Sequence, residues 1–296
     1  MSNVPLGGHI PALVTPLLGD GQVDFEVFAR LVTRALDHGS VAVLVGGSTG
    51  EGPLVRADVR AHLVAAAVAA ADGAGVVACV SGSSLDDVFE DVERAVSAGA
   101  VSVLALAPFY FPLSAPEHAA AQIAIADRSP VPVFTYHIPQ MTGVALDADA
   151  VAELAAHPNM AGMKDSSGDL AGMRAFVAAG SGHQFTVFQG NGPLVLAALD
   201  AGAAGSITAI ANVCPDIVAA LHAAFDRGDR NEAAAAQDEL TRVSAVLSAA
   251  PGTLAVAVKA ALQVEGVIPE RACLPPLLAL SQTEVEVLAA GLRPPV

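Results

Sequence analysis

Apolar strand-like segments alternate with helical segments along most of this 296-residue chain, and the connections between them are short. The strand candidates are continuous apolar runs, which is typical of parallel strands covered on both faces. They are residues 10–15, 42–46, 76–80, 102–107, 131–136, 161–164, 186–189 and 205–208. The helical patterns between them are residues 25–38, 57–71, 85–98, 116–127, 148–156, 170–179 and 194–201. Eight such units favour an α/β fold of the TIM (β/α)8 barrel type.

The same alternation also allows an open, doubly wound sheet. No glycine-rich dinucleotide-binding turn follows the first strand candidate, and this weakens that alternative. After Asn212 the pattern contains only helices, at residues 215–227, 231–249, 253–265 and 283–290. We expect the first of these to close the barrel and the others to form a C-terminal helical extension. The predicted units are therefore a catalytic barrel, residues 1–228, and the extension, residues 229–296.

Composition restricts the functions that remain open. The formal net charge of −16 argues against nucleic acid and anionic membranes as partners, so an anionic substrate would need donors placed locally. No apolar run reaches membrane-spanning length and the N-terminus does not resemble a signal peptide, which gives a cytoplasmic location as the default expectation. The three isolated cysteines and eight scattered histidines predict neither a disulfide framework nor a metal site.

Lysine occurs only twice, at Lys164 and Lys259. Lys164 ends an apolar strand candidate and precedes a polar loop. A buried amine is costly unless it is used, and burial favours the neutral amine that attacks ketones to form a Schiff base. We therefore predict that Lys164 is a nucleophile, the alternative being a structural pair with a carboxylate such as Asp165. Lys259 falls in a predicted helix, and we expect a surface or packing role for it.

The working residues of a TIM barrel lie in the loops after its strands. After the second strand candidate comes Gly46-Gly47-Ser48-Thr49-Gly50-Glu51-Gly52. Glycines let the backbone approach a ligand, and successive N–H groups together with the Ser48 and Thr49 hydroxyls suit a carboxylate. An ordinary glycine-rich turn with a helix cap is the alternative. For Glu51 we expect only a role in anchoring the loop.

Both tyrosines of the chain fall at the ends of strand candidates. Tyr136 ends the fifth, where a hydroxyl could move protons beside the lysine. The adjacent His137 is more readily explained as a hydrogen-bonded structural residue. Tyr110 lies in the aromatic segment Pro108-Phe109-Tyr110-Phe111-Pro112, and considered alone it favours a core or subunit contact over catalysis.

Several segments share their order and spacing with one enzyme family. They are Gly47-Ser48-Thr49-Gly50-Glu51, Tyr136-His137-Ile138-Pro139 with Thr142-Gly143, Gly162-Met163-Lys164-Asp165, and Gly202-Ala203-Ala204-Gly205-Ser206-Ile207 with Ala211-Asn212. In this pattern the chain resembles the dihydrodipicolinate synthase and N-acetylneuraminate lyase family of class I, pyruvate-dependent aldolases. The resemblance covers nearly the whole chain. It implies a TIM barrel with a helical C-terminal extension, assembled as a homotetramer of paired dimers.

The resemblance also implies roles for individual residues. Lys164 would form a Schiff base with pyruvate or another 2-oxo acid, without a metal or an organic cofactor, and Tyr136 would be the acid and base beside it. Tyr110 would reach a neighbouring subunit's site and complete a proton relay. Ser48 and Thr49 would hold the carboxylate of the 2-oxo acid. The other substrate-binding positions are Gly47, Ser166 and Ile207.

The subfamily depends on the loop after Tyr136. Dihydrodipicolinate synthases usually carry an arginine there for a dicarboxylate-bearing substrate, whereas this chain has Gln140-Met141-Thr142. A thioether does not replace the forked donors of arginine, which counts against that activity. Sialic acid lyases carry acidic sugar-binding residues near positions occupied here by the uncharged Asn191-Gly192-Pro193.

Other segments are most similar to 4-hydroxy-2-oxoglutarate aldolase, and 2-keto-3-deoxy sugar-acid aldolases and dehydratases share much of the pattern. Those segments are residues 157–166, 189–192 and 272–288. The sequence therefore predicts a Schiff-base aldolase that cleaves or forms a 4-hydroxy-2-oxo acid with pyruvate as one partner. The alternatives are a 2-keto-3-deoxy sugar-acid dehydratase, a dihydrodipicolinate synthase and a non-catalytic ligand-binding protein. The identity of the aldehyde stays open.

Overall fold

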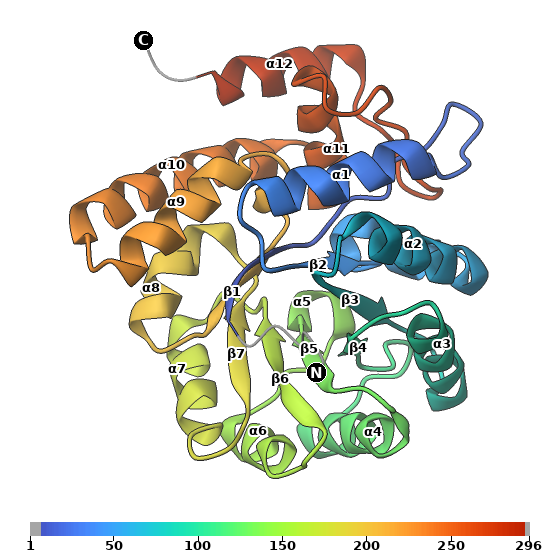
Figure 1. Ribbon diagram of the computed structural model, residues 1–296, viewed down its shortest axis with the longest axis vertical. Helices are drawn as coiled ribbons and strands as arrows, with labels where there is room; N and C mark the ends of the chain where they lie inside the picture. Colours follow the sequence, from blue (N-terminus) through green and yellow to red (C-terminus); the bar gives the residue numbers. More distant parts are fainter. Residues whose placement is uncertain (1–6, 294–296) are drawn as a thin grey trace.

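Parallel strands form the centre of the computed structural model, which describes residues 7–293. Within those residues an eight-stranded sheet has the order β1-β8-β7-β6-β5-β4-β3-β2, and each neighbouring pair is parallel (Figure 1). The strands are β1 (Gly8–Pro11), β2 (Ala42–Val45), β3 (Gly75–Val80), β4 (Ser102–Leu106), β5 (Val133–His137), β6 (Met160–Asp165), β7 (Thr186–Gln189) and β8 (Gly205–Thr208).

Hydrogen bonds between the two ends of this sheet nearly close it into a barrel. The Leu13 amide donates to the Leu44 carbonyl at 3.0 Å, and the Val41 amide donates to the His9 carbonyl at 3.2 Å. The predicted TIM barrel is therefore confirmed, and the doubly wound sheet is excluded. The first strand begins and ends earlier than the predicted residues 10–15. Beyond Pro11 only Ala12 pairs with β2, and the Thr15 side chain instead donates its hydroxyl to the Gly50 carbonyl at 2.7 Å.

Helices follow the strands and cover the outside of the barrel. They are α1 (Phe25–Asp37), α2 (Ala57–Ala70), α3 (Leu85–Ser97), α4 (Ala115–Arg128), α5 (Pro139–Thr142), α6 (Ala148–Ala155), α7 (Leu170–Ala179), α8 (Val195–Asp200) and α9 (Pro215–Asp226). Side-chain caps begin several of them, as at Ser84, whose hydroxyl accepts from the Asp87 amide. The four-residue α5 was not predicted. It turns the chain immediately after β5.

Alternation along the strands divides the core into two parts. Phe134 and Tyr136 of β5 belong to an apolar cluster inside the barrel, together with Phe188 of β7 and Ile207 of β8. Val133 of β5 instead belongs to the larger cluster between the strands and the surrounding helices. Side chains fill the barrel interior, so a substrate can enter only at its end.

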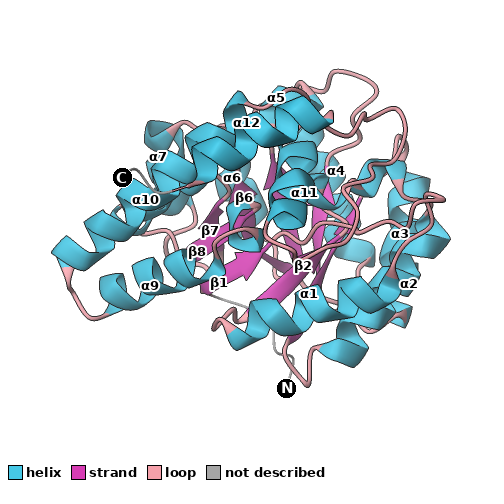
Figure 2. Ribbon diagram, turned by 90° about the horizontal axis from the view of Figure 1, so that it is seen from above, coloured by secondary structure: helices cyan, strands magenta, loops and turns pink. Residues whose placement is uncertain are grey.

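The C-terminal extension comprises α10 (Arg230–Ala249), α11 (Leu254–Val264) and α12 (Gln282–Leu292). These helices lie at one end of the molecule, at the top of Figure 1 and in front of the strands in Figure 2. α10 packs against the short turns η3 (Gly192–Leu194) and η4 (Ile210–Asn212), and α11 packs against η1 (Ser48–Gly50). Since these turns follow β7, β8 and β2, the extension covers part of the barrel face where the strands end.

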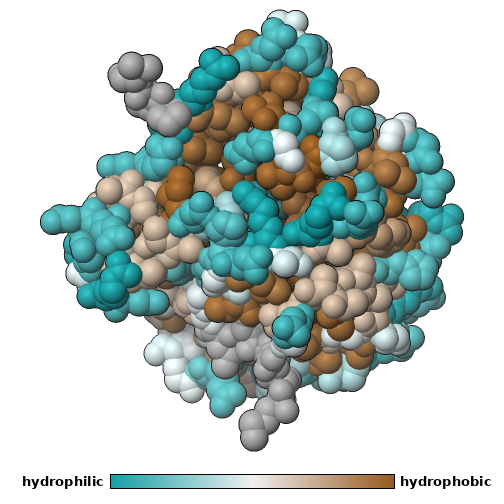
Figure 3. Space-filling view, turned by 45° about the horizontal axis from the view of Figure 1, so that its top comes forward, coloured by the Kyte–Doolittle hydropathy of each residue, from teal (hydrophilic) through white to brown (hydrophobic). Residues whose placement is uncertain are grey.

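The surface of this end mixes polar and apolar side chains (Figure 3). Leu278 and Val287 of the extension are largely exposed. Within residues 7–293, no single helix is both long and apolar enough to cross a membrane; α10 and α11 reach that composition only when counted together across a 110° bend. The division of the chain into a barrel, residues 1–228, and an extension, residues 229–296, stays a prediction.

Candidate active site

The loop after β2 is held in a tight conformation by its glycines. Gly46 has a φ of 73°, and the Gly50 and Gly52 amides both donate to the Gly47 carbonyl, at 2.9 and 3.0 Å. A Cβ atom on Gly52 would come within 1.6 Å of the Gly46 carbonyl oxygen. Larger residues would therefore break this turn. It carries Ser48 and the buried Thr49 at the end of the barrel.

Lys164 and Tyr136 meet inside the barrel. They are register partners on β6 and β5, so their side chains leave the sheet on the same side. Both are buried, and the Lys164 Nζ lies 3.1 Å from the Tyr136 phenolic oxygen and 4.3 Å from the centre of the ring. The Ser48 hydroxyl lies 3.5 Å from the same phenolic oxygen. A serine from the loop after β2, a tyrosine from β5 and a lysine from β6 thus form one polar row.

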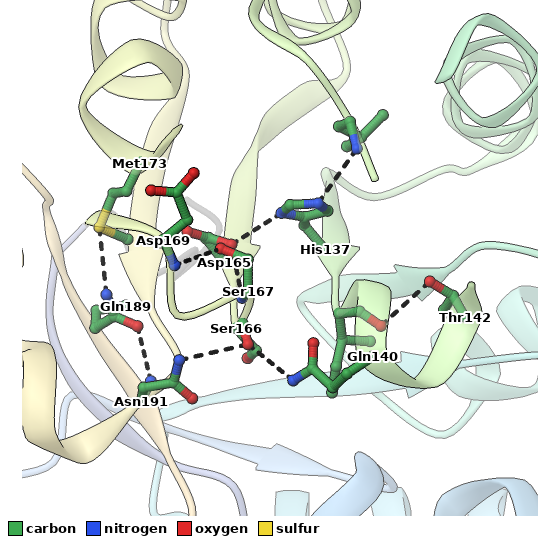
Figure 4. Close-up of polar contacts among 12 residues, drawn as sticks. His137, Gln140, Thr142, Asp165, Ser166, Ser167, Asp169, Met173, Gln189 and Asn191 are labelled. Carbon is green, nitrogen blue, oxygen red and sulfur yellow. Dashed lines mark hydrogen bonds and ion pairs between the residues drawn. The ribbon is translucent and has the colours of Figure 1, made fainter. Parts of the chain in front are cut away.

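Asp165 does not pair with Lys164, although the sequence left that possibility open. As the next residue on β6, Asp165 faces the other side of the sheet, where its Oδ1 lies 2.9 Å from the His137 Nδ1 (Figure 4). The His137 Nε2 accepts from the Leu146 amide at 3.2 Å. This network assigns the proton of the ring to Nδ1. The interpretation of His137 as a hydrogen-bonded residue is confirmed, and within residues 7–293 no ion pair joins Lys164 to a carboxylate.

Ser166 joins the loops that follow β5, β6 and β7. Its carbonyl accepts from the Gln140 side chain at 2.9 Å and from the Asn191 side chain at 3.4 Å (Figure 4). A Cβ atom at position 190 would lie 1.9 Å from the Ser166 hydroxyl oxygen, so Gly190 leaves the room that this hydroxyl needs. The positions of Gln140 and Asn191 were noted in the sequence, but their convergence on Ser166 depends on the curvature of the barrel.

The remaining predicted residues separate into two groups. Gly47 and Thr49 belong to the loop that bears Ser48, and Ile207 lies in the apolar cluster that contains Tyr136. Tyr110 is elsewhere: it is 75% exposed, and its ring packs edge to face on Phe111 with centroids 5.1 Å apart. A single chain therefore does not bring Tyr110 into the row of Ser48, Tyr136 and Lys164.

A cavity of about 290 Å³ lies between the loops after β7 and β8 and the extension. It is lined by uncharged residues only: Gly190, Asn191, Gly192, Pro193, Leu194, Ala209, Ile210, Ser244, Leu247, Ser248 and Leu254. Met141, in the neighbouring α5, is 57% exposed. Across residues 7–293, no cluster of three or more His, Cys, Asp or Glu side chains could hold a metal ion.

Two buried ion pairs near the loop were missed at the sequence level. Of the surface and packing roles expected for Lys259, the surface position is wrong, because Lys259 is fully buried and forms an ion pair with Glu51. The anchoring role of Glu51 is confirmed, since its carboxylate also accepts from the Leu274 amide at 2.6 Å. The second pair joins Arg60 and Asp91 at 2.8 Å. Neither pair could be found from sequence spacing, because their members lie on different elements.

Comparison with known proteins places the whole chain in one group. The model of the dihydrodipicolinate synthetase family matches residues 5–293. A 4-hydroxy-tetrahydrodipicolinate synthase from an Exiguobacterium species is 35% identical over 263 residues, which is 88% of either chain.

Solved structures agree in fold. A dihydrodipicolinate synthase of Bacillus anthracis is 29% identical, with a TM-score of 0.92 over 98% of both chains. A dihydrodipicolinate synthase of Acinetobacter baumannii, solved in complex with pyruvate, is 26% identical, with a TM-score of 0.91 over 97% of this chain and 98% of that one.

Proposed function

Because the chain belongs to the dihydrodipicolinate synthetase family, we propose that it is a Schiff-base aldolase that cleaves or forms a 4-hydroxy-2-oxo acid. The family makes it a pyruvate-dependent carbon–carbon lyase. The observation that carries the finer proposal is the 3.1 Å contact between the Lys164 Nζ and the Tyr136 hydroxyl. A buried amine beside a proton-transfer group is the arrangement that Schiff-base chemistry requires.

The reaction begins at Lys164. Its amine attacks the C2 carbonyl of the substrate, and loss of water gives a protonated imine. Tyr136 takes the proton of the C4 hydroxyl as the C3–C4 bond breaks, the aldehyde leaves, and the bonding electrons move into the imine to form an enamine. Protonation of the enamine at C3 and addition of water to the imine then release pyruvate and restore the amine. This sequence needs no metal and no organic cofactor.

The loop after β2 supplies the site for the substrate carboxylate in this proposal. Ser48 lies 3.5 Å from the Tyr136 oxygen, so a carboxylate next to C2 would lie within reach of the Ser48 and Thr49 hydroxyls. The backbone amides of Ser48 and Thr49, at the start of a short helical turn, add further donors. These local donors oppose the field of a chain whose net charge is −16.

The far end of the substrate meets an uncharged surface. The Gln140 amide is bound to the Ser166 carbonyl, Met141 is exposed, and the cavity lined by Asn191, which also contacts Ser166, has no charged lining residue. This favours an uncharged, hydroxylated tail of the 2-keto-3-deoxy sugar-acid type over a second carboxylate, as in 4-hydroxy-2-oxoglutarate. A dehydratase acting on the same sugar acids would use the same imine.

Dihydrodipicolinate synthase, also named 4-hydroxy-tetrahydrodipicolinate synthase, is the second candidate, because relatives such as the Exiguobacterium enzyme carry the latter name at 35% identity. The deciding experiment measures pyruvate release from 2-keto-3-deoxygluconate, 4-hydroxy-2-oxoglutarate and N-acetylneuraminate, alongside condensation of pyruvate with aspartate semialdehyde. Pyruvate plus an aldehyde identifies the aldolase, whereas loss of water without pyruvate identifies the dehydratase. Condensation as efficient as the best cleavage reaction would instead assign the synthase.

The proposal includes assembly and location. Tyr110, Phe111 and Phe109 form an exposed aromatic segment, and aromatic side chains are enriched where subunits meet. We place this segment at the interface of a close dimer, two of which form a homotetramer in the cytoplasm. Tyr110 would then approach the active site of the partner subunit.

A further inference from the structure

The loop that bears Ser48 and Thr49 contains a buried, left-handed glutamate. Glu51 has φ 56° and ψ 26°, a conformation that is uncommon for residues other than glycine. Its side chain is 0% exposed and contacts Lys259 and Leu274 of the C-terminal extension. One carboxylate oxygen accepts from the Leu274 amide at 2.6 Å, and the other is paired with Lys259.

Lys259 is equally enclosed. It projects from α11, its side chain is 0% exposed, and its Nζ donates to the Ala272 carbonyl at 2.8 Å in addition to its pairing with Glu51. The pair thus joins three separate parts of the chain: the loop after β2, helix α11 and the segment that contains Ala272 and Leu274. The packing of α11 against η1 brings these parts together.

The end of the loop is held by a second, largely buried pair. Arg60 of α2 donates to the Gly52 carbonyl at 2.9 Å and to the Val55 carbonyl at 2.6 Å. Its guanidinium also contacts Asp91 of α3 at 2.8 Å, and the Asp91 carboxylate accepts from the Ser81 amide at 3.1 Å. The loop is therefore held at two places, by the Glu51–Lys259 pair and by the Arg60–Asp91 pair. Neither pair belongs to the row around Lys164.

Buried ion pairs are a poor way to stabilise a fold, because removing two charges from water offsets most of their attraction. What they do provide is a defined geometry, since each partner has one well-matched position. Glu51 directly follows the turn Ser48–Gly50, and its amide donates to the Ser48 carbonyl at 3.2 Å, so a displacement of Glu51 would be passed on to this turn.

We propose that Lys259 is a positioning residue for substrate binding, which acts through Glu51 to hold the Ser48–Thr49 loop in its carboxylate-binding conformation. The C-terminal extension thereby forms part of the active-site structure. The inference rests on the proposed role of Ser48 and Thr49. It adds a residue that touches neither the substrate nor the reacting atoms.

The test measures how pyruvate concentration controls trapping of the imine by borohydride, using purified full-length protein. Lys259→Met leaves Glu51 without its partner, and we expect the half-saturating pyruvate concentration to rise at least tenfold, with the trapped fraction at saturation within about threefold of wild type. This result would mean that the substitution weakens binding equally in the ground state and the transition state. Hydrogen exchange of the amides of residues 47–52 should accelerate in the same variant.

Arg242→Met is the matched control. Arg242 ties α10 to the end of α12 through the Gly291 carbonyl at 2.9 Å, so its loss loosens the extension far from the loop. We expect a lower melting temperature with less than a twofold change in half-saturating pyruvate. In the double variant Glu51→Gln/Lys259→Met no buried charge is left unpaired, so the melting temperature should recover while pyruvate binding stays weak.

The outcomes separate the two proposals. Absence of trapping in the wild-type protein overturns the proposed function itself. Normal trapping in the wild type combined with unchanged half-saturation in Lys259→Met, or recovery of pyruvate binding together with stability in the double variant, overturns the positioning role. If Lys259→Met does not fold, Glu51→Gln replaces it, and failure of both to fold assigns the pair to stability alone.

Discussion

The Lys164 amine and the Tyr136 hydroxyl lie 3.1 Å apart because β5 and β6 pair with these two residues in register. A shift of one residue in either strand would turn one side chain toward the surrounding helices. The candidate reaction centre is therefore built into the sheet itself, on its most rigid elements.

Pyruvate should form a borohydride-stable adduct on Lys164. The neutral amine attacks the C2 carbonyl, and reduction of the imine fixes the three-carbon unit as a secondary amine. Mass spectrometry of peptides from the treated protein locates the adduct. Lys259 is an internal control, since it is fully buried against Glu51. An adduct on Lys259 instead of Lys164 would contradict the mechanism.

Tyr136→Phe should lower turnover by about two to four orders of magnitude, the scale expected for loss of an acid–base group. Phenylalanine keeps the ring that packs inside the barrel beside Phe134 and Ile207, and removes only the hydroxyl that contacts Lys164. Steady-state kinetics and a melting curve check this. Turnover close to wild type at unchanged stability would show that another group moves the proton.

Local patterns in the sequence predicted most of the barrel. Apolar runs fixed the eight strand positions to within a few residues, and the alternation of strands and helices limited the topology. The error at β1 arose because its apolar run continues past Pro11, where only tertiary contacts such as Thr15 with Gly50 end the pairing. Hydrophobicity alone does not contain that information.

The candidate site was predictable only in part, for the same reason. Lys164 and Tyr136 stand at strand ends, where a barrel places its working residues, so their meeting followed from the fold. The pairing of Lys259 with Glu51 did not follow from the barrel fold, because it also requires a helix of the extension to pack on the loop after β2. A lysine within a helix otherwise predicts a solvent-exposed side chain.

Cys79 should resist alkylation in the native protein. Burial raises the pKa of the Cys79 thiol to about 12, even though the nearby Lys164 lowers it. Because the thiolate is the reactive form, iodoacetamide at pH 8 should leave Cys79 unmodified for hours, while protein in denaturant reacts at all three cysteines. Peptide mass spectrometry after a timed reaction measures this. Rapid native labelling of Cys79 would show that the barrel opens.

Stability should fall with acidification between about pH 6.5 and pH 4, partly through His222. Burial is the main cause that lowers the pKa of His222 to about 4, and the neighbouring His9, at a ring distance of 5.5 Å, adds to it. In this pH range the His222 ring is protonated in the unfolded chain but not in the folded protein. The contribution of His222 to the free energy of unfolding is therefore complete above pH 6.5 and decreases as the pH falls. The total loss, reached below pH 4, is about 3 kcal/mol.

His222→Gln should flatten that part of the pH profile, because glutamine has no charge to gain and can still reach the Ser206 hydroxyl, which lies 2.9 Å from the His222 Nε2. Urea unfolding at half-unit pH steps provides the free energies. The exposed His183, replaced by glutamine, is the matched control and should leave the slope unchanged. Equal slopes for the wild type and His222→Gln would exclude the linkage.

Tyr110 should act in a neighbouring subunit. Its hydroxyl is exposed in the single chain and its ring contacts Phe111, so a role in proton transfer requires a second chain to bring it to an active site. Tyr110→Phe should then reduce turnover by about tenfold or more while leaving the melting temperature and the sedimentation coefficient near wild type. Phe111→Ala, which removes the supporting ring, should weaken assembly and activity together. A sedimentation experiment that finds a fully active monomer at assay concentration would contradict both the interface and the shared relay.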